Sequence, residues 1–216
     1  ENETYFQSLL LKLEENHFPG CYEEEIYSFY VYALNYCTGR INAGISAYYQ
    51  NLFRVYELLD LHNRLIRDKS LSQWTFLNIV TTACNLGKFT WAEKFIHNNH
   101  IYISALHQNN ALYHNLALLA FYQNNYEKAL EYLPKVTFSD PYYALNGRML
   151  QLRVFFEMKE WLLLDALLER VRIYLLRDKT LPKSRKKESQ NFLKSIKLLA
   201  LYKQTPQSSV HYKKNI

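Results

Sequence analysis

Residues 110–141 read NALYHNLALLAFYQNNYEKALEYLPKVTFSDP, and this stretch decides the fold. In both halves of it apolar side chains recur every three or four positions, and the polar run QNN separates the halves. This spacing predicts two short amphipathic helices joined by a turn. Ala117 and Ala129 provide small side chains where the two helix axes would cross, which lets the helices approach closely. Pro134 falls inside the second half, so we expect that helix to bend or end early, near Leu133.

The same pattern recurs on either side of this stretch. Ala92, Ala129 and Leu164 occupy equivalent positions, spaced by 37 and 35 residues. Two further sets of residues keep the same register, namely Phe89, Tyr126 and Trp161, and then Ile96, Leu133 and Leu168. A period of this length indicates stacked helix pairs, because each pair leaves an apolar face that only its neighbour can cover. We expect clear repeats at residues 73–109, 110–144 and 145–178.

The composition favours an all-α protein. The chain has 216 residues, of which 49% are hydrophobic, and only five glycines and five prolines interrupt the helical spacing. Cys21, Cys37 and Cys84 are odd in number and widely spaced, which is typical of free thiols in a reducing compartment. No apolar run approaches the roughly 18 residues that a membrane span requires. We therefore expect a cytoplasmic protein with no membrane partner.

One set of residues in the quoted stretch matches the positions of a known repeat. The set comprises Tyr113, Leu116, Ala117, Tyr126, Ala129 and Pro141. With these residues the stretch resembles a tetratricopeptide repeat (TPR). The preceding repeat keeps Phe76, Asn78, Gly87, Phe89 and Ala92, and the following one keeps Phe155, Trp161 and Val171. The resemblance implies an α-α superhelix, a right-handed solenoid of antiparallel helix pairs.

The N-terminal third is expected to add helices to the same domain. Tyr5, Leu9, Leu10 and Leu13 place an apolar stripe on a first helix. The carboxylates of residues 23–25 are expected in the first turn of a second helix, where the helix dipole favours them. Gly39 is expected to end that helix, and a long third helix is expected from Ile41 to Leu59. Ser72 is a predicted N-cap for the first repeat.

The C-terminal part is expected to close the array. Residues 182–203 are predicted to form a capping helix with an inward stripe of Phe192, Ile196, Leu199 and Ala200. Residues 204–216 lack periodicity and are predicted to be a flexible tail. We expect a single domain over residues 1–203, which could be a fragment of a longer repeat array. Self-association through an unpaired N-terminal repeat face is left open.

The resemblance also implies where a partner binds. In such repeats the first helix of each pair lines a concave groove. The residues of this chain at those positions are Trp74, Asn78, Asn85, His114, Asn115, Tyr122, Asn146 and Arg153. Since these side chains are polar or aromatic with little net charge, we expect a non-enzymatic scaffold that binds a protein or peptide partner.

A basic cluster supplies the alternative function. It consists of Arg177, Lys179, Lys183, Arg185, Lys186 and Lys187, in a chain whose formal net charge is +6. Such a cluster could neutralise several phosphates of a nucleic acid. Aromatic residues do not interleave with these cations, so a solvated helix face is the favoured interpretation. Nucleic-acid binding is the second hypothesis.

Catalytic and metal sites are not predicted. The five glycines are too scattered for a phosphate-binding loop, and no CxxC, HExxH or nucleophile-elbow motif occurs. His97, His100, His107 and His114 lie close in sequence, and the first two have a spacing compatible with metal ligation. Asparagine and glutamine surround them, which favours a hydrated connection between repeats. We expect no enzymatic activity, no cofactor and no bound metal.

Overall fold

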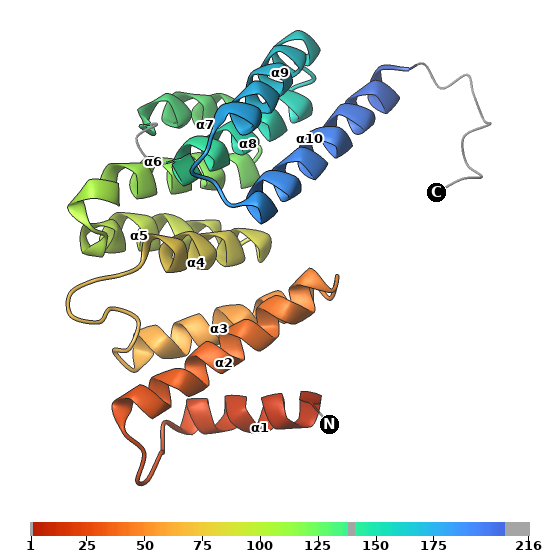
Figure 1. Cartoon of the computed structure of the whole chain (residues 1–216). Helices are drawn as coiled ribbons and strands as arrows, with labels where there is room; N and C mark the ends of the chain where they lie inside the picture. Colours follow the sequence, from red (N-terminus) through yellow and green to blue (C-terminus); the bar gives the residue numbers. More distant parts are fainter. Residues whose placement is uncertain (1, 138–140, 206–216) are drawn as a thin grey trace. The chain divides into compact units, whose positions relative to one another are not determined.

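The structure is a computed structural model that describes residues 2–137 and 141–205 (Figure 1). Within these ranges the chain forms α-helices and two short 3-10 helices but no β-strand, which confirms the predicted all-α class. The chain divides into two compact units, Glu1–Asn124 and Asn125–Ile216. The boundary falls in the polar turn between the two halves of residues 110–141. No helix in the described part of the chain has both the length and the apolar character needed to cross a membrane.

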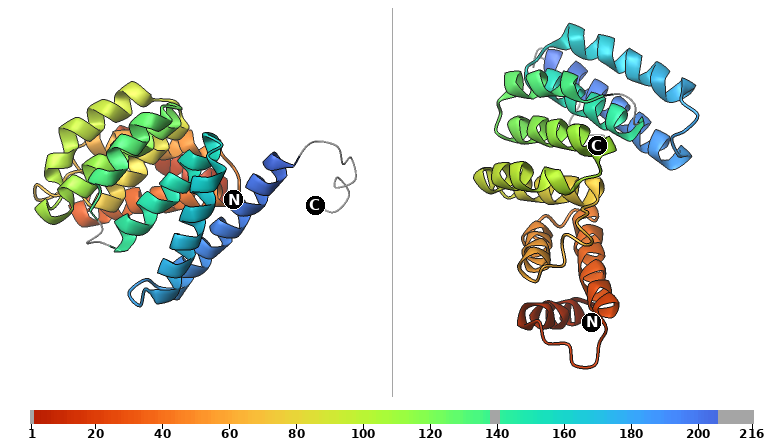
Figure 2. Two further views of the ribbon diagram at one scale, coloured as in Figure 1. Left: turned by 90° about the horizontal axis from the view of Figure 1, so that it is seen from above. Right: turned by 90° about the vertical axis from the view of Figure 1, so that its left-hand side faces the viewer.

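In the N-terminal unit, residues 2–124 form six α-helices and one 3-10 helix. They are α1 (Asn2–Glu15), α2 (Glu23–Asn42), α3 (Tyr48–Leu61), α4 (Gln73–Asn85), α5 (Phe89–Asn99), η1 (His100–Tyr102) and α6 (Ala105–Tyr122). From α1 to α6, consecutive α-helices pack against each other, and α4 also packs against α6. In Figure 2 (right) the colours of this unit follow one another from red to green. The helices of this unit are therefore layered in chain order.

Aromatic side chains hold three of these layers together. The ring of Phe53 on α3 lies 4.8 Å from that of Trp91 on α5, measured between centroids. Trp91 stacks on Phe95 at 5.1 Å, and Phe95 lies 5.4 Å from Phe76 on α4. Such aromatic pairs add stabilisation beyond their buried area. Large rings fill the wedges between successive helices here, and the small Ala92 is completely buried beside them.

The helix boundaries of this unit confirm two predictions. Helix α2 begins at Glu23, so its three carboxylates lie in the first turn, and the Glu25 carboxylate accepts a 2.7 Å hydrogen bond from the Tyr22 backbone N–H. Ser72 is the N-cap of α4, where its hydroxyl oxygen accepts a hydrogen bond from the Trp74 N–H. Both arrangements satisfy N–H groups that have no partner within a helix.

The predicted break at Gly39 is wrong. Helix α2 continues through Gly39 to Asn42, and the reversal occurs at Gly44, whose φ of +87° is left-handed. Glycine adopts this conformation without a steric cost, whereas one glycine inside a helix costs only about 1 kcal/mol. As a result, Ile41 belongs to α2 and the third helix begins at Tyr48.

The inward face of α1 differs from the prediction at one position. Phe6 and Leu13 are fully buried, while Tyr5 is 71% exposed. The Phe6 ring stacks on Tyr36 of α2 at 4.6 Å. Leu13 confirms the predicted stripe, whereas Phe6 takes the inward place expected for Tyr5, because Phe has no hydroxyl to keep hydrated.

The described residues of the C-terminal unit, 125–137 and 141–205, form four α-helices and one 3-10 helix. They are α7 (Tyr126–Tyr132), η2 (Leu133–Lys135), α8 (Pro141–Glu157), α9 (Trp161–Arg177) and α10 (Lys183–Gln204). Helix α7 ends at Tyr132 and Pro134 lies in η2, as predicted. Helices α8 and α9 pack against each other, and α10 packs against both. Leu152, Leu164 and Val171 are completely buried in their core.

The expected capping helix corresponds to α10, but its inward stripe differs at one position. Leu193, Ile196 and Ala200 are buried against α8 and α9. Leu199 was expected on this stripe and is 55% exposed. Leu193 replaces it because residues 193, 196 and 200 repeat at the three- and four-residue spacing of one helix face. The predicted tail lies outside the described residues from 206 onward.

Candidate functional site

Six of the eight predicted groove residues lie on α4 and α6 of the N-terminal unit. Trp74, Asn78 and Asn85 lie on one stripe of α4, because their spacings of four and seven residues correspond to whole helical turns. Trp74 is 36% exposed, and Asn78 and Asn85 are exposed. This stripe of α4 therefore presents two amides and an indole to solvent.

A hydrogen bond joins these two helices at their C-terminal ends. Asn85 is the last residue of α4 and Tyr122 is the last residue of α6. The Asn85 side-chain amide donates to the Tyr122 hydroxyl at 3.1 Å and also to the backbone carbonyl of Thr81 at 2.8 Å. The structure thus brings together two predicted groove residues that are 37 positions apart.

Two other predicted groove residues are buried. His114 and Asn115 on α6 are 4% and 0% exposed. The Asn115 amide donates a 2.7 Å hydrogen bond to the Ala111 backbone carbonyl of the preceding turn. These side chains are inaccessible to a partner, so the accessible part of the predicted site in this unit comprises Trp74, Asn78, Asn85 and Tyr122.

The remaining groove residues lie on α8 of the C-terminal unit. Asn146 and Arg153 are both half-buried. The Asn146 carbonyl oxygen accepts a hydrogen bond of 2.5 Å from the guanidinium of Arg185 on α10. A predicted groove residue is therefore in contact with a residue of the predicted basic cluster, which the separate sequence patterns did not suggest.

The residues of the basic cluster fall into two groups, one paired within the protein and one exposed to solvent. Arg185 also pairs with Glu188 at 3.3 Å, and the Lys186 ammonium group donates to the Asp178 backbone carbonyl. Both side chains are half-buried. Arg177, Lys179, Lys183 and Lys187 are exposed. Lys183 and Lys187 occupy the start of α10, where the helix dipole adds to their positive potential instead of compensating it.

The four histidines of the predicted connection do not converge. His97 is exposed, and the imidazole of His100 lies 2.9 Å from the backbone carbonyl of His97. His107 is half-buried and His114 is buried in α6. Within residues 2–137 and 141–205, no group of three or more histidine, cysteine, aspartate or glutamate side chains is arranged to hold a metal ion.

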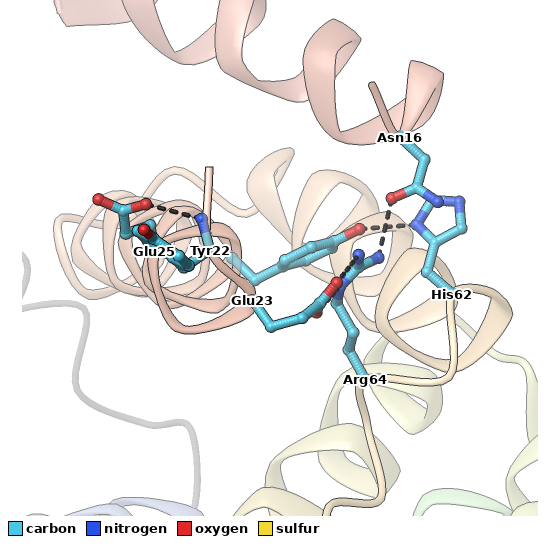
Figure 3. A network of polar contacts seen from close by, with 7 residues as sticks. Asn16, Tyr22, Glu23, Glu25, His62 and Arg64 are labelled. Atoms are coloured by element: carbon cyan, nitrogen blue, oxygen red, sulfur yellow. Dashed lines mark hydrogen bonds and ion pairs between the residues drawn. The ribbon is translucent and has the colours of Figure 1, made fainter. Parts of the chain in front are cut away.

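A polar network that the sequence analysis did not identify surrounds Arg64 (Figure 3). The Arg64 guanidinium donates two hydrogen bonds of 3.0 Å to the Glu23 carboxylate on α2. It donates a third, of 2.8 Å, to the Asn16 carbonyl oxygen at the end of α1. The same network contains a 2.7 Å hydrogen bond between the Tyr30 hydroxyl and His62 Nδ1. Arg64 thus ties the connection after α3 to both α1 and α2.

This network adjoins a pocket of about 120 Å³. Its polar lining residues are Arg64, Arg67, Ser70, Ser72 and Thr75. The Arg67 guanidinium lies 4.5 Å from the centre of the Tyr27 ring and pairs with Glu24. Each arginine already has a carboxylate partner on α2. Both positive charges are therefore paired within the protein, and neither requires a bound ligand.

The electrostatics of the network follow from its contacts. Hydrogen bonds from Arg64 lower the pKa of the Glu23 carboxyl below its ordinary value. Burial, followed by the charges of Arg64 and Arg54, lowers the pKa of His62. Burial raises the pKa of Tyr30. A neutral imidazole can accept a hydrogen bond at Nδ1 from the tyrosine hydroxyl.

One sequence signal for this network was present. The segment from Arg64 to Ser72 holds two arginines three positions apart, opposite a helix that begins with three glutamates. Arginine forks match carboxylates in a bidentate geometry. What the sequence could not supply was the chain reversal at Gly44, which brings Glu23 and Arg64 together although they are 41 residues apart.

Comparison with known proteins adds no further assignment. No protein-family model matches this sequence, and no match was found among curated proteins or among solved structures.

Proposed function

We propose that this chain is a non-enzymatic scaffold of TPR-like helical repeats, a right-handed solenoid of antiparallel helix pairs that binds a protein or peptide partner. The observation that carries the proposal is the contact between Asn85 and Tyr122. These residues are 37 positions apart, the same interval that separates Ala92 from Ala129. In a stack of repeats, a shift by one repeat places equivalent positions side by side. A contact between such positions is what a solenoid requires.

The accessible residues on α4 and α6 suit a peptide ligand. Asn78 and Asn85 offer amide donors and acceptors, which can pair with the backbone of an extended segment. Trp74 and Tyr122 offer aromatic area with a polar handle, the residue types that dominate binding energy at many interfaces. The three free cysteines favour a reducing compartment, so we place this scaffold in the cytoplasm.

A peptide selection tests the binding proposal. The selection uses a phage library that displays random peptides of about twelve residues. A peptide of this length can span two helices whose axes lie about 10 Å apart. Selected peptides are then synthesised and measured by fluorescence anisotropy against the wild-type chain and against Trp74→Ala, Asn78→Arg and Tyr122→Ala. The matched control is Leu11→Ala, which removes an apolar side chain that is 61% exposed on α1 of the same unit.

The proposal predicts that the three substitutions on α4 and α6 weaken binding by about tenfold or more, which corresponds to 1.4 kcal/mol. Leu11→Ala should leave the affinity unchanged. If selection yields no peptide, or if all four variants bind as the wild type does, this face is not the binding site.

Solution scattering tests the solenoid arrangement independently. A compact globule of 216 residues has a radius of gyration of roughly 17 Å. A stack of helix pairs is extended, so the measured radius should be clearly larger at concentrations where the chain is monomeric. A value near the globular one would contradict the solenoid.

The basic cluster supports a second candidate function, the binding of nucleic acid. The favouring observation is that Lys183 and Lys187 lie at the positive end of the α10 dipole, with Arg177 and Lys179 exposed just before that helix. Binding of a single-stranded RNA probe should then weaken steeply with salt. Glutamate at Lys183 and Lys187 should abolish it, whereas Lys12→Glu, an exposed change on α1, should not. Absence of binding at low salt would remove this candidate.

A further inference from the structure

The outer face of the second half of α10 is apolar and uncovered. Leu198, Leu199, Leu201 and Tyr202 are 67%, 55%, 52% and 71% exposed, although the opposite side of the same helix is buried through Leu193, Ile196 and Ala200. Four large apolar side chains within five residues are more than the scattered exposure that soluble proteins normally show. These four residues, together with Lys194 and Lys197 of the same helix, are called the α10 surface.

Cations border these apolar groups. Lys194, Leu198 and Tyr202 follow one another at intervals of four residues, which places them on one stripe of the helix. Lys197 precedes Leu201 by four residues and lies beside it in the same way. Both lysines are exposed. No aspartate or glutamate occurs between Ser189 and Thr205, so the α10 surface is uniformly positive at its border.

The charge of the α10 surface selects among possible occupants. A second copy of the chain, paired through the same face, would bring Lys194 and Lys197 toward their own counterparts, and like charges oppose such pairing. Residues 206–216 contain two lysines and no acidic residue, so their sequence does not complement the surface either. A partner with apolar side chains bordered by carboxylates satisfies both features.

We propose that the α10 surface docks an amphipathic helix of a protein partner, whose apolar stripe is flanked by aspartate or glutamate. The apolar side chains of the partner would pack on Leu198, Leu201 and Tyr202 and exclude water from them. Its carboxylates would pair with Lys194 and Lys197 and fix the direction of the helix. The α10 surface shares no residue with the peptide-binding face proposed on α4 and α6.

Designed peptides that carry this chemistry test the proposal directly. The first is a helix of about eighteen residues, roughly 27 Å long, with leucines on one stripe and glutamates beside them. The second peptide replaces every glutamate by lysine, and the third has the composition of the first in scrambled order. Each carries a fluorophore and is titrated with the full chain at low and at moderate salt.

Two variants and one control locate the site. Leu198→Ser combined with Tyr202→Ser removes apolar area, and Lys194→Glu combined with Lys197→Glu reverses the border charge. All four positions are exposed, so the fold should persist, which circular dichroism checks. The control is Leu176→Ser on α9, where an isolated leucine is 63% exposed.

The proposal predicts that only the acidic peptide binds the wild-type chain. Its affinity should fall by about tenfold or more in the serine variant and remain unchanged in the control. The charge-reversed variant should lose the acidic peptide and gain the lysine peptide. Equal binding of the acidic and lysine peptides, or binding of neither, would overturn the proposal.

Two further measurements identify the competing occupants. Light scattering would reveal a dimer that the serine variant converts to monomer, in which case a second copy covers the surface. Co-sedimentation with vesicles of phosphatidylserine and phosphatidylcholine, lost in the serine variant while the acidic peptide fails to bind, would assign the surface to a membrane. Either result would overturn the assignment to an acidic helix.

Discussion

The amide of Asn85 donates a 3.1 Å hydrogen bond to the hydroxyl of Tyr122, and each residue is the last one of its helix. The two helix ends are therefore aligned, although α5 and η1 intervene in the chain. This contact also fixes the register of α4 against α6, because a shift by one residue would turn either side chain through about 100°.

A double-mutant cycle measures this contact. Asn85→Ala and Tyr122→Phe each remove one partner, and we expect a coupling free energy of about 0.5 kcal/mol, typical of a partly exposed neutral hydrogen bond. Urea unfolding of the wild type, both single variants and the double variant gives this value. Strict additivity of the two single changes would show that the contact contributes nothing to stability.

Helix packing around Ala117 should tolerate no larger side chain. This residue is completely buried on α6, so Ala117→Leu is expected to destabilise the chain by about 1 to 3 kcal/mol through overpacking. Ala166→Leu makes the same change at an exposed position of α9 and should stay within about 0.5 kcal/mol of the wild type. Similar unfolding midpoints for the two variants would contradict close packing at Ala117.

The planar geometry of the Arg64 guanidinium should contribute more to stability than its charge does. Arg64→Lys keeps the charge but cannot form the paired bonds to Glu23 together with the bond to Asn16. We expect a lower melting temperature and faster proteolysis after α1. Arg54→Lys is the control, since Arg54 is 43% exposed and forms no bidentate pair, with one contact of 2.8 Å to Glu14 and one of 3.8 Å to Glu57. Equal effects of the two substitutions would count against a specific role for the fork.

The pair formed by Tyr30 and His62 should make stability depend on pH. Burial lowers the pKa of His62 in the folded chain, so the unfolded chain takes up a proton first as the pH falls. The stabilisation is complete above the unfolded pKa of about 6.5 and decreases below it. The difference in unfolding free energy between the wild type and His62→Gln should therefore be larger at about pH 7.5 than at about pH 5.5.

Glu23 does not interfere with that measurement. Its pKa is lowered from a reference value of 4.5, so the stabilisation it provides is lost only at more acidic pH. A difference between wild type and His62→Gln that stays constant across the range would show that His62 does not titrate differently in the folded and unfolded chains.

The three cysteines should differ in reactivity. Cys21 is exposed, whereas burial raises the pKa of Cys37 and of Cys84 to about 12. Because the thiolate is the reactive form, Ellman's reagent should label only Cys21 in the folded chain and all three thiols in guanidinium. The Cys21→Ser variant should show no rapid labelling before denaturation. Rapid labelling of that variant would show that a buried cysteine becomes accessible.

Several features of the fold were predicted correctly from the sequence. The spacing of apolar residues predicted the helices, Ser72 predicted the start of α4, and Pro134 predicted the end of α7. These features depend on local backbone chemistry, which neighbouring residues determine. The break at Gly39 and the inward position of Tyr5 on α1 were wrong, because several glycines and more than one aromatic position are locally compatible with a helix. Packing against α2 then selects Phe6 in place of Tyr5.

For the candidate site, too, some features follow from the sequence and others from the packing of the helices. The sequence by itself determined the helical class, the repeat interval and the composition of the stripe on α4, since periodicity and small residues at fixed spacing are properties of the chain. Only the tertiary structure decided that His114 and Asn115 are buried, that Asn85 meets Tyr122, and that Arg64 joins Glu23. It also decided which side of α10 is left uncovered. The physical reason is that burial and long-range contacts depend on which faces meet, and residues distant in the sequence supply those faces.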